Sequence, residues 1–213
     1  MTAALKPGAD DALIVVDVQN DFCAGGSLAA PDGEGVVPVI NRLAPAFAHV
    51  IATQDWHPAG HQSFASSHPG KQPFETVRVS YGEQTLWPDH CVQDTPGAAF
   101  HQHLDLAGAQ LILRKGCRRE IDSYSAFFEN DRTTATGLSG YLRTRGVSRL
   151  FVAGLVTDFC VCYSAIDGRN EGFEVVVIED ACRAIDQDGS LDAAWIAMQE
   201  AGVRRIDATV FDG

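Results

Sequence analysis

Residues 150–160, LFVAGLVTDFC, begin as an unbroken apolar run and end in a polar turn. An apolar run without alternation is typical of a strand that is buried on both faces of a parallel sheet. The next stretch, 158–171, has the composition of a helix, and Gly172 follows it as a common helix stop. This part of the chain therefore predicts one strand–turn–helix unit of an α/β fold.

The same alternation extends along the chain in both directions. Short runs rich in β-branched and aliphatic residues predict further strands at 12–18, 50–53, 110–113, 174–178 and 206–211. Helix-like segments lie between them at 36–48, 137–145 and 190–201. This order predicts a three-layer α/β/α sandwich with a mostly parallel, roughly six-stranded, Rossmann-like sheet.

Length and charge narrow the class of protein. The 213 residues, 46% of them hydrophobic, can form one domain over 1–213, and no linker-like segment divides them. A net charge of −12 would repel phosphate backbones and anionic lipid, so we expect neither nucleic acid nor a membrane as a partner. A small-molecule substrate, with a possible homo-oligomer, is the expected alternative.

The location of the protein is also suggested by what the sequence lacks. No basic segment followed by a short apolar run opens the chain, and no apolar stretch approaches the ~20 residues of a membrane span. The six cysteines are scattered through the chain, which favours free thiols in a reducing compartment. We therefore expect a cytoplasmic protein.

Three polar residues stand where predicted strands end, which is where an open parallel sheet binds ligands. Asp17 interrupts the first apolar run, Lys115 follows the third, and Cys160 lies at the start of a helix. A helix start and a nearby lysine both favour a thiolate, and a carboxylate can move its proton, so the set predicts an activated nucleophile. Taken singly, each residue would more often be structural than catalytic.

A second group of polar residues lies in the long, weakly periodic stretch 55–108, and a loop of that length is usually functional. Asp55 and His57 are two apart at a strand end, and His90 can supply a third ligand. One carboxylate and two imidazoles suit one divalent metal ion, zinc first, with iron or manganese as alternatives. His61 is a spare ligand, and the remaining histidines are expected to be surface or structural residues, namely His49, His68, His101 and His103.

At these positions the sequence resembles the nicotinamidase/pyrazinamidase branch of the isochorismatase-like cysteine hydrolases over nearly its whole length. The motifs are DVQNDFCAGGSLA from Asp17, QDWHPAGHQSF around Asp55, LWPDHCVQDTPGA around His90, RKGCRREIDSYSAF around Lys115 and GLVTDFCVCYSA around Cys160. The resemblance implies that Asp17, Lys115 and Cys160 form a catalytic triad and that Asp55, His57 and His90 bind the metal.

Further features follow from the same resemblance. Phe22, Trp87 and Tyr124 match positions that line the family's substrate pocket, and Ser63 stands where some members have another histidine ligand. A cis peptide bond is expected between Leu155 and Val156, where the backbone N–H groups of Val156 and Cys160 are the candidate oxyanion donors.

The resemblance implies hydrolysis of nicotinamide to nicotinate and ammonia through a cysteine thioester, feeding NAD salvage, with pyrazinamide as a second substrate. Two rivals keep the fold and change the substrate: a carbamoyl-amide or ureido-amide hydrolase, and an isochorismatase. Two others change the class: an iron-dependent oxygenase using the two-histidine, one-carboxylate set, and a non-enzymatic binding protein.

Overall fold

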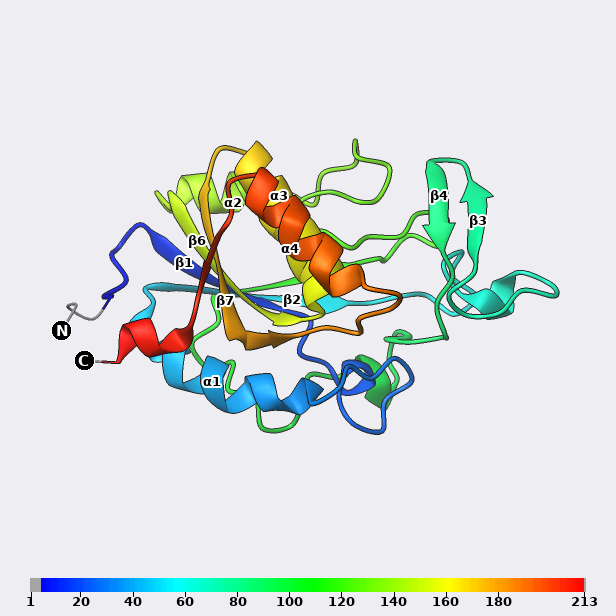
Figure 1. Cartoon of the computed structure of the whole chain (residues 1–213), viewed down its shortest axis with the longest axis horizontal. Helices are drawn as coiled ribbons and strands as arrows, with labels where there is room; N and C mark the ends of the chain where they lie inside the picture. The colour runs from blue at the N-terminus through cyan, green and yellow to red at the C-terminus, as the bar shows by residue number, and fades with distance from the viewer. Residues whose placement is uncertain (1–4, 213) are drawn as a thin grey trace.

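A computed structural model describes residues 5–212 and contains a six-stranded parallel sheet, shown in Figure 1. Its strand order is β5-β2-β1-β6-β7-β8. The strands are β1 (Asp11–Val16), β2 (His49–Asp55), β5 (Leu111–Lys115), β6 (Arg149–Leu155), β7 (Glu174–Arg183) and β8 (Arg204–Ile206). Every adjacent pair runs parallel, and helices cover both faces, so the predicted fold class is confirmed.

The core lies on both faces of the sheet, as the unbroken apolar runs predicted. All six residues of β1 are buried, and successive side chains point to opposite faces. One face packs against α1 (Val36–Leu43), and the other packs against α2 (Leu138–Thr144), α3 (Cys162–Asn170) and α4 (Ser190–Glu200). Figure 1 shows α1 on one side of the sheet with α3 and α4 on the other.

Some predicted boundaries are wrong for local reasons. The segment 206–211 is a strand only up to Ile206, because the side chain of Asp207 accepts a hydrogen bond from the backbone of Thr209 and starts a 3-10 turn. The helix predicted over 36–48 ends at Leu43, and a 3-10 turn containing Pro45 follows it.

The long stretch 55–108 contains an element that the sequence pattern did not reveal. Strands β3 (Thr76–Val79) and β4 (Gly82–Thr85) form an antiparallel hairpin, which Figure 1 shows beyond the end of the main sheet. Both strands are four residues long and rich in polar residues, so they carry little of the apolar pattern that predicts a strand.

The parallel topology places the carboxyl ends of all six strands at one edge of the sheet. The chain proceeds from β1 outward to β2 and β5, then crosses to β6 on the other side of β1 and continues to β7 and β8. The strand order therefore reverses between β1 and β6, which is where open α/β sheets bind ligands. Within residues 5–212, no helix combines the length and apolar character needed to cross a membrane.

Candidate active site and metal centre

The three residues predicted as a nucleophile and its activating groups meet at this edge. Asp17 follows β1, Lys115 ends β5, and Cys160 lies in the turn after β6. Nζ of Lys115 is 2.7 Å from Oδ2 of Asp17 and 3.3 Å from Sγ of Cys160. All three side chains are buried, so they interact with little screening by water.

Two backbone features bring Asp17 close to the nucleophile turn. Asp17 has a φ of 46°, a left-handed conformation that turns the chain out of β1. Gly154 in β6 approaches β1 so closely that a Cβ atom there would lie 2.1 Å from the carbonyl oxygen of Val16. Only glycine fits at that contact, which joins the ends of β1 and β6.

The two carboxylate oxygens of Asp17 have different surroundings. Oδ1 accepts a hydrogen bond of 2.6 Å from the hydroxyl of Thr53, whose oxygen also accepts one from the backbone N–H of Asp17. Oδ2 is in ionic contact with Lys115, but it accepts no hydrogen bond of good geometry from residues 5–212. Oδ2 is therefore a buried oxygen beside the Lys115 ammonium that still has capacity to accept a proton.

Lys115 connects this group with the neighbouring residues that are predicted to bind a metal. Its ammonium group donates to Oδ1 of Asp55 at 2.8 Å and to the carbonyl of Ser123 at 3.0 Å. Burial alone would lower the pKa of Lys115, but the carboxylates of Asp17 and Asp55 outweigh it and raise that pKa well above its usual value. Lys115 therefore keeps its charge and does not act as a base.

The thiol of Cys160 differs from the expectation of a preformed thiolate. Burial raises the pKa of Cys160 well above its usual value, and the opposing effect of Lys115 is smaller. The turn around it, Thr157–Val161, is π-helical and precedes α3, so Cys160 is not in the first turn of an α-helix. Burial also raises the pKa of Asp17, which makes this carboxylate a stronger base than usual.

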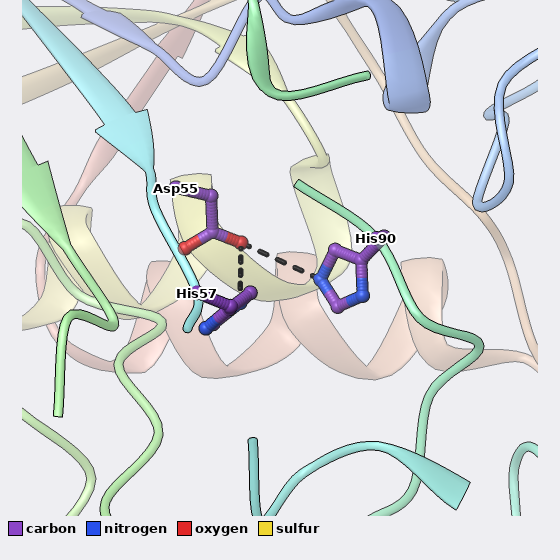
Figure 2. Close-up of side chains that lie close together, drawn as sticks. All are labelled: Asp55, His57 and His90. Carbon is purple, nitrogen blue, oxygen red and sulfur yellow. Dashed lines mark hydrogen bonds and ion pairs between the residues drawn. The ribbon is translucent and has the colours of Figure 1, made fainter. Parts of the chain in front are cut away.

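The predicted metal ligands also converge, as Figure 2 shows. Oδ2 of Asp55 lies 3.2 Å from Nε2 of His57 and 3.5 Å from Nε2 of His90. The Nδ1 atoms of the two imidazoles face the backbone carbonyls of Gly116 and Pro88, at 3.1 and 2.8 Å. A carbonyl only accepts, so both Nδ1 atoms carry a proton, and both Nε2 atoms, which face Asp55, are the nitrogens that could bind a metal ion. This donor set fits a divalent metal ion.

Neighbouring residues position these ligands. The side chain of Gln19 makes two hydrogen bonds with the backbone of Asp55, at 2.8 and 2.7 Å, and so joins the end of β2 to the chain after β1. Gly116 has a φ of 66°, and a Cβ atom there would lie 2.5 Å from the ring of His57. The glycine after Lys115 therefore leaves the space that the imidazole occupies.

His61 and Ser63 are next to the metal ligands but are paired with each other. Nε2 of His61 donates to the carbonyl of Arg118 at 2.9 Å, and Nδ1 is 2.7 Å from the hydroxyl of Ser63. Burial lowers the pKa of His61, which favours the neutral ring. Both ring nitrogens are occupied in this arrangement. The other four histidines lie outside the cluster and are partly or fully exposed.

Asp122 and Gln84 belong to the same buried network and were not predicted. Oδ1 of Asp122 is 3.9 Å from Nε2 of His57, and Oδ2 accepts a 2.9 Å hydrogen bond from Gln84 in β4. Gln84 also donates to the hydroxyl of Tyr124 at 3.0 Å. Asp122 stands in the quoted stretch around Lys115, but nothing in the local pattern separates it from a surface carboxylate.

The predicted pocket aromatics surround the nucleophile. Phe22, Trp87 and Tyr124 line a small cavity with Cys160, Asp55 and His90, so the predicted nucleophile and two of the three predicted metal ligands face one space. Trp87 donates through its indole N–H to the hydroxyl of Tyr124 at 3.1 Å. The expected cis peptide bond is present between Leu155 and Val156.

Known proteins share both the sequence and this fold. Residues 11–210 match the isochorismatase domain. The nicotinamidase of Acinetobacter baylyi is 53% identical, covering 96% of this chain and 95% of that one, and the nicotinamidase of Escherichia coli is 44% identical, covering 90% and 92%.

Solved structures agree with these relatives. A nicotinamidase/pyrazinamidase of Acinetobacter baumannii superposes with a TM-score of 0.94 at 55% identity, over 95% of this chain and 98% of that one. PnC1 of L. infantum, solved with nicotinate, gives 0.85 at 37% identity over 97% and 98%. A pyrazinamidase of Pyrococcus horikoshii, solved with zinc, gives 0.76 at 33% identity over 93% and 99%.

Proposed function

The chain belongs to the isochorismatase domain family, and from that premise we propose that it is a nicotinamidase, which hydrolyses nicotinamide to nicotinate and ammonia. The observation that carries this proposal is the position of Lys115, whose ammonium contacts Asp17, Cys160 and Asp55 within 3.3 Å. One buried cation thus joins a cysteine nucleophile to a metal-binding cluster, and this combination supports amide hydrolysis by a covalent route.

The first half of the reaction forms a thioester. The free Oδ2 of Asp17 takes the proton of Cys160, and Lys115 stabilises the thiolate as it forms. The thiolate attacks the amide carbon, while the backbone N–H groups of Val156 and Cys160 are the proposed donors to the negatively charged oxygen. The carbon–nitrogen bond then breaks, and Asp17 returns the proton to the departing ammonia.

The second half releases the product. Water enters the place that ammonia left, and Asp17 accepts a proton from it as its oxygen attacks the thioester carbon. The carbon–sulfur bond breaks, nicotinate forms, and the proton returns to the sulfur of Cys160. Lys115 stays charged throughout, because the carboxylates beside it hold its pKa high.

We propose that Asp55, His57 and His90 hold one divalent metal ion, zinc first, with iron or manganese as alternatives. Such an ion supplies an open ligand position for the pyridine nitrogen and so orients the ring. Phe22, Trp87 and other apolar lining residues would pack against the ring faces. Pyrazinamide, which keeps a nitrogen at the same ring position, should be a second substrate.

The wider role of the reaction is inferred from its product. Nicotinate is a precursor for pyridine nucleotides, so we propose that the enzyme feeds NAD salvage. We place it in the cytoplasm, where the free thiols would stay reduced. A homo-oligomer is compatible with this role.

Ammonia release from nicotinamide by the purified, metal-loaded protein tests the proposal. Cys160→Ala is the matched control, because it should lose turnover while keeping nicotinamide binding, as measured by calorimetry. Turnover of a ureido or carbamoyl amide without turnover of nicotinamide would instead favour a relative with the same fold. Full activity in Cys160→Ala would exclude the thioester.

A further inference from the structure

The cavity beside Cys160 is too small for any ring-containing amide. Its volume is about 20 Å³, which is close to the space of one water molecule. A six-membered aromatic ring with a carboxamide is several times larger. At least one wall of the cavity must therefore move before such a substrate can reach the sulfur.

Three of the lining side chains are partly exposed, namely Tyr124, Phe159 and Ile185, and the others are buried. The hydroxyl of Tyr124 accepts two hydrogen bonds from neighbouring side chains, which hold it in place. The ring of Phe159 packs edge-on against Trp87 and Tyr124, with ring centroids 4.7 and 5.6 Å apart, which holds it in place. Neither of these contacts restrains the side chain of Ile185, which lies in the loop of residues 184–189 between β7 and α4.

One carboxylate holds this loop. Oδ1 of Asp158 accepts from the backbone N–H of Ile185 at 3.2 Å, and Oδ2 accepts from the backbone N–H of Asp186 at 2.8 Å and from the hydroxyl of Ser190 at 2.5 Å. Asp158 is buried in the turn that carries Cys160 and forms no ion pair with residues 5–212. Two of these donors belong to the loop and the third, Ser190, begins α4, so Asp158 ties the loop and the start of the helix to the nucleophile turn.

The backbone conformation of this loop favours its opening. Asp186, Asp188 and Gly189 have φ angles of 55°, 52° and 82°, and a left-handed conformation is costly for the two aspartates. Asp158 and Ser190 also line an open groove of about 640 Å³, which shares Phe159 with the wall of the cavity. The three hydrogen bonds of Asp158 are only partly buried beside this groove, so solvent water would compete for them when the loop moves.

We propose that residues 184–189 form a lid over the Cys160 cavity, that Ile185 is the lid side chain that limits the size of the substrate, and that Asp158 is the positioning residue that latches it. Breaking the bonds to Asp158 lets Ile185 withdraw and admits the ring, and re-forming them closes the site around the thioester. The lid rests on the proposed function in one respect, which is that the cavity beside Cys160 is the substrate site.

The test measures access to Cys160 and needs no nicotinamide. The alkylation rate of the Cys160 peptide is followed by mass spectrometry with a small reagent, iodoacetamide, and with a bulky one, N-phenylmaleimide. Losing the charge of Asp158 can change the reactivity of the thiol, but that change affects both reagents alike. The ratio of the bulky to the small rate therefore reports the opening of the lid.

In Asp158→Asn this ratio should rise about tenfold, because the loop loses a hydrogen bond to a charged acceptor. Ser190→Ala removes one donor without changing charge and should raise the ratio by a smaller factor. Ile185→Ala should raise it while the backbone N–H groups of 185 and 186 stay protected from hydrogen exchange. Asp188→Asn makes the same chemical change on the exposed part of the loop and should leave the ratio unchanged.

An unchanged ratio in folded Asp158→Asn would overturn the latch. If Asp158→Asn does not fold, an unchanged ratio in both Ser190→Ala and Ile185→Ala overturns the lid. The alkylation ratios could behave as expected in a protein that does not hydrolyse nicotinamide. That result would support the lid and contradict the proposed function, so the two failures are distinguishable.

Discussion

Thr53 offers the sharpest test of Asp17 as the base. The hydroxyl of Thr53 is buried, donates to Oδ1 of Asp17 at 2.6 Å and accepts from the backbone N–H of Asp17 at 3.2 Å. Thr53→Val keeps the shape of the side chain and removes both contacts. Thr53→Ser keeps the hydroxyl and is the matched control.

The size and sign of the effect follow from these contacts. Burial raises the pKa of Asp17, while the hydrogen bond from Thr53 favours the ionised carboxyl and opposes that rise. A hydrogen bond to a charged group contributes about 1.5–3 kcal/mol, and one pKa unit corresponds to about 1.4 kcal/mol. Removing the bond should therefore raise the pKa of Asp17 further, by about one to two pH units.

The base form of Asp17 is lost as the pH falls through its pKa. The acid limb of kcat/KM for nicotinamide should therefore move to higher pH in Thr53→Val by that amount, while the activity well above the limb changes little. Ammonia release over a range of pH measures the limb, with circular dichroism as the check of folding. A folded Thr53→Val enzyme with the acid limb of the wild type would show that another group limits the rate at low pH.

Three further predictions concern the neighbouring groups. Lys115→Met leaves Asp17 buried without its cation, so the free energy of unfolding should fall by about 3–5 kcal/mol in denaturant titrations, and a stability equal to the wild type would contradict the ion pair. Gln84→Met removes the donor to Asp122 and should weaken zinc binding about tenfold in a chelator competition. An unchanged zinc affinity would show that Gln84 in β4 does not support the proposed metal site. His90→Ala, or chelation, should abolish the preference for nicotinamide over benzamide, and a strong preference in folded, metal-free protein would assign ring recognition to the apolar pocket.

The strand ends could be located from the sequence because their signal is local. A buried parallel strand is a continuous apolar run, so a polar residue at its end stands out, as Asp17 does after β1. Lys115 likewise follows a short apolar run, although β5 is an edge strand that is only partly buried. Parallel strands bring their carboxyl ends to one edge, and that rule places Asp17, Lys115, Asp55 and Cys160 at the same edge. The strand order β5-β2-β1-β6, which makes them neighbours, is set by the tertiary structure. The hairpin β3–β4 was not predicted from the sequence, because its strands are too short and polar for such a signal.

The chemical state of the site depended on contacts that no local pattern contains. Thr53 meets Asp17 across 36 positions of sequence, and Gln84 meets Asp122 across 38. The helix start and Lys115 predicted a thiolate at Cys160, but complete burial, which only the packed structure sets, raises the pKa of that thiol. The sequence by itself thus determined the fold class and brought the reactive residues to one edge, because apolar periodicity and strand direction are written along the chain. The tertiary structure decided which protons they carry, since desolvation and hydrogen bonds depend on residues that become neighbours only when the chain folds.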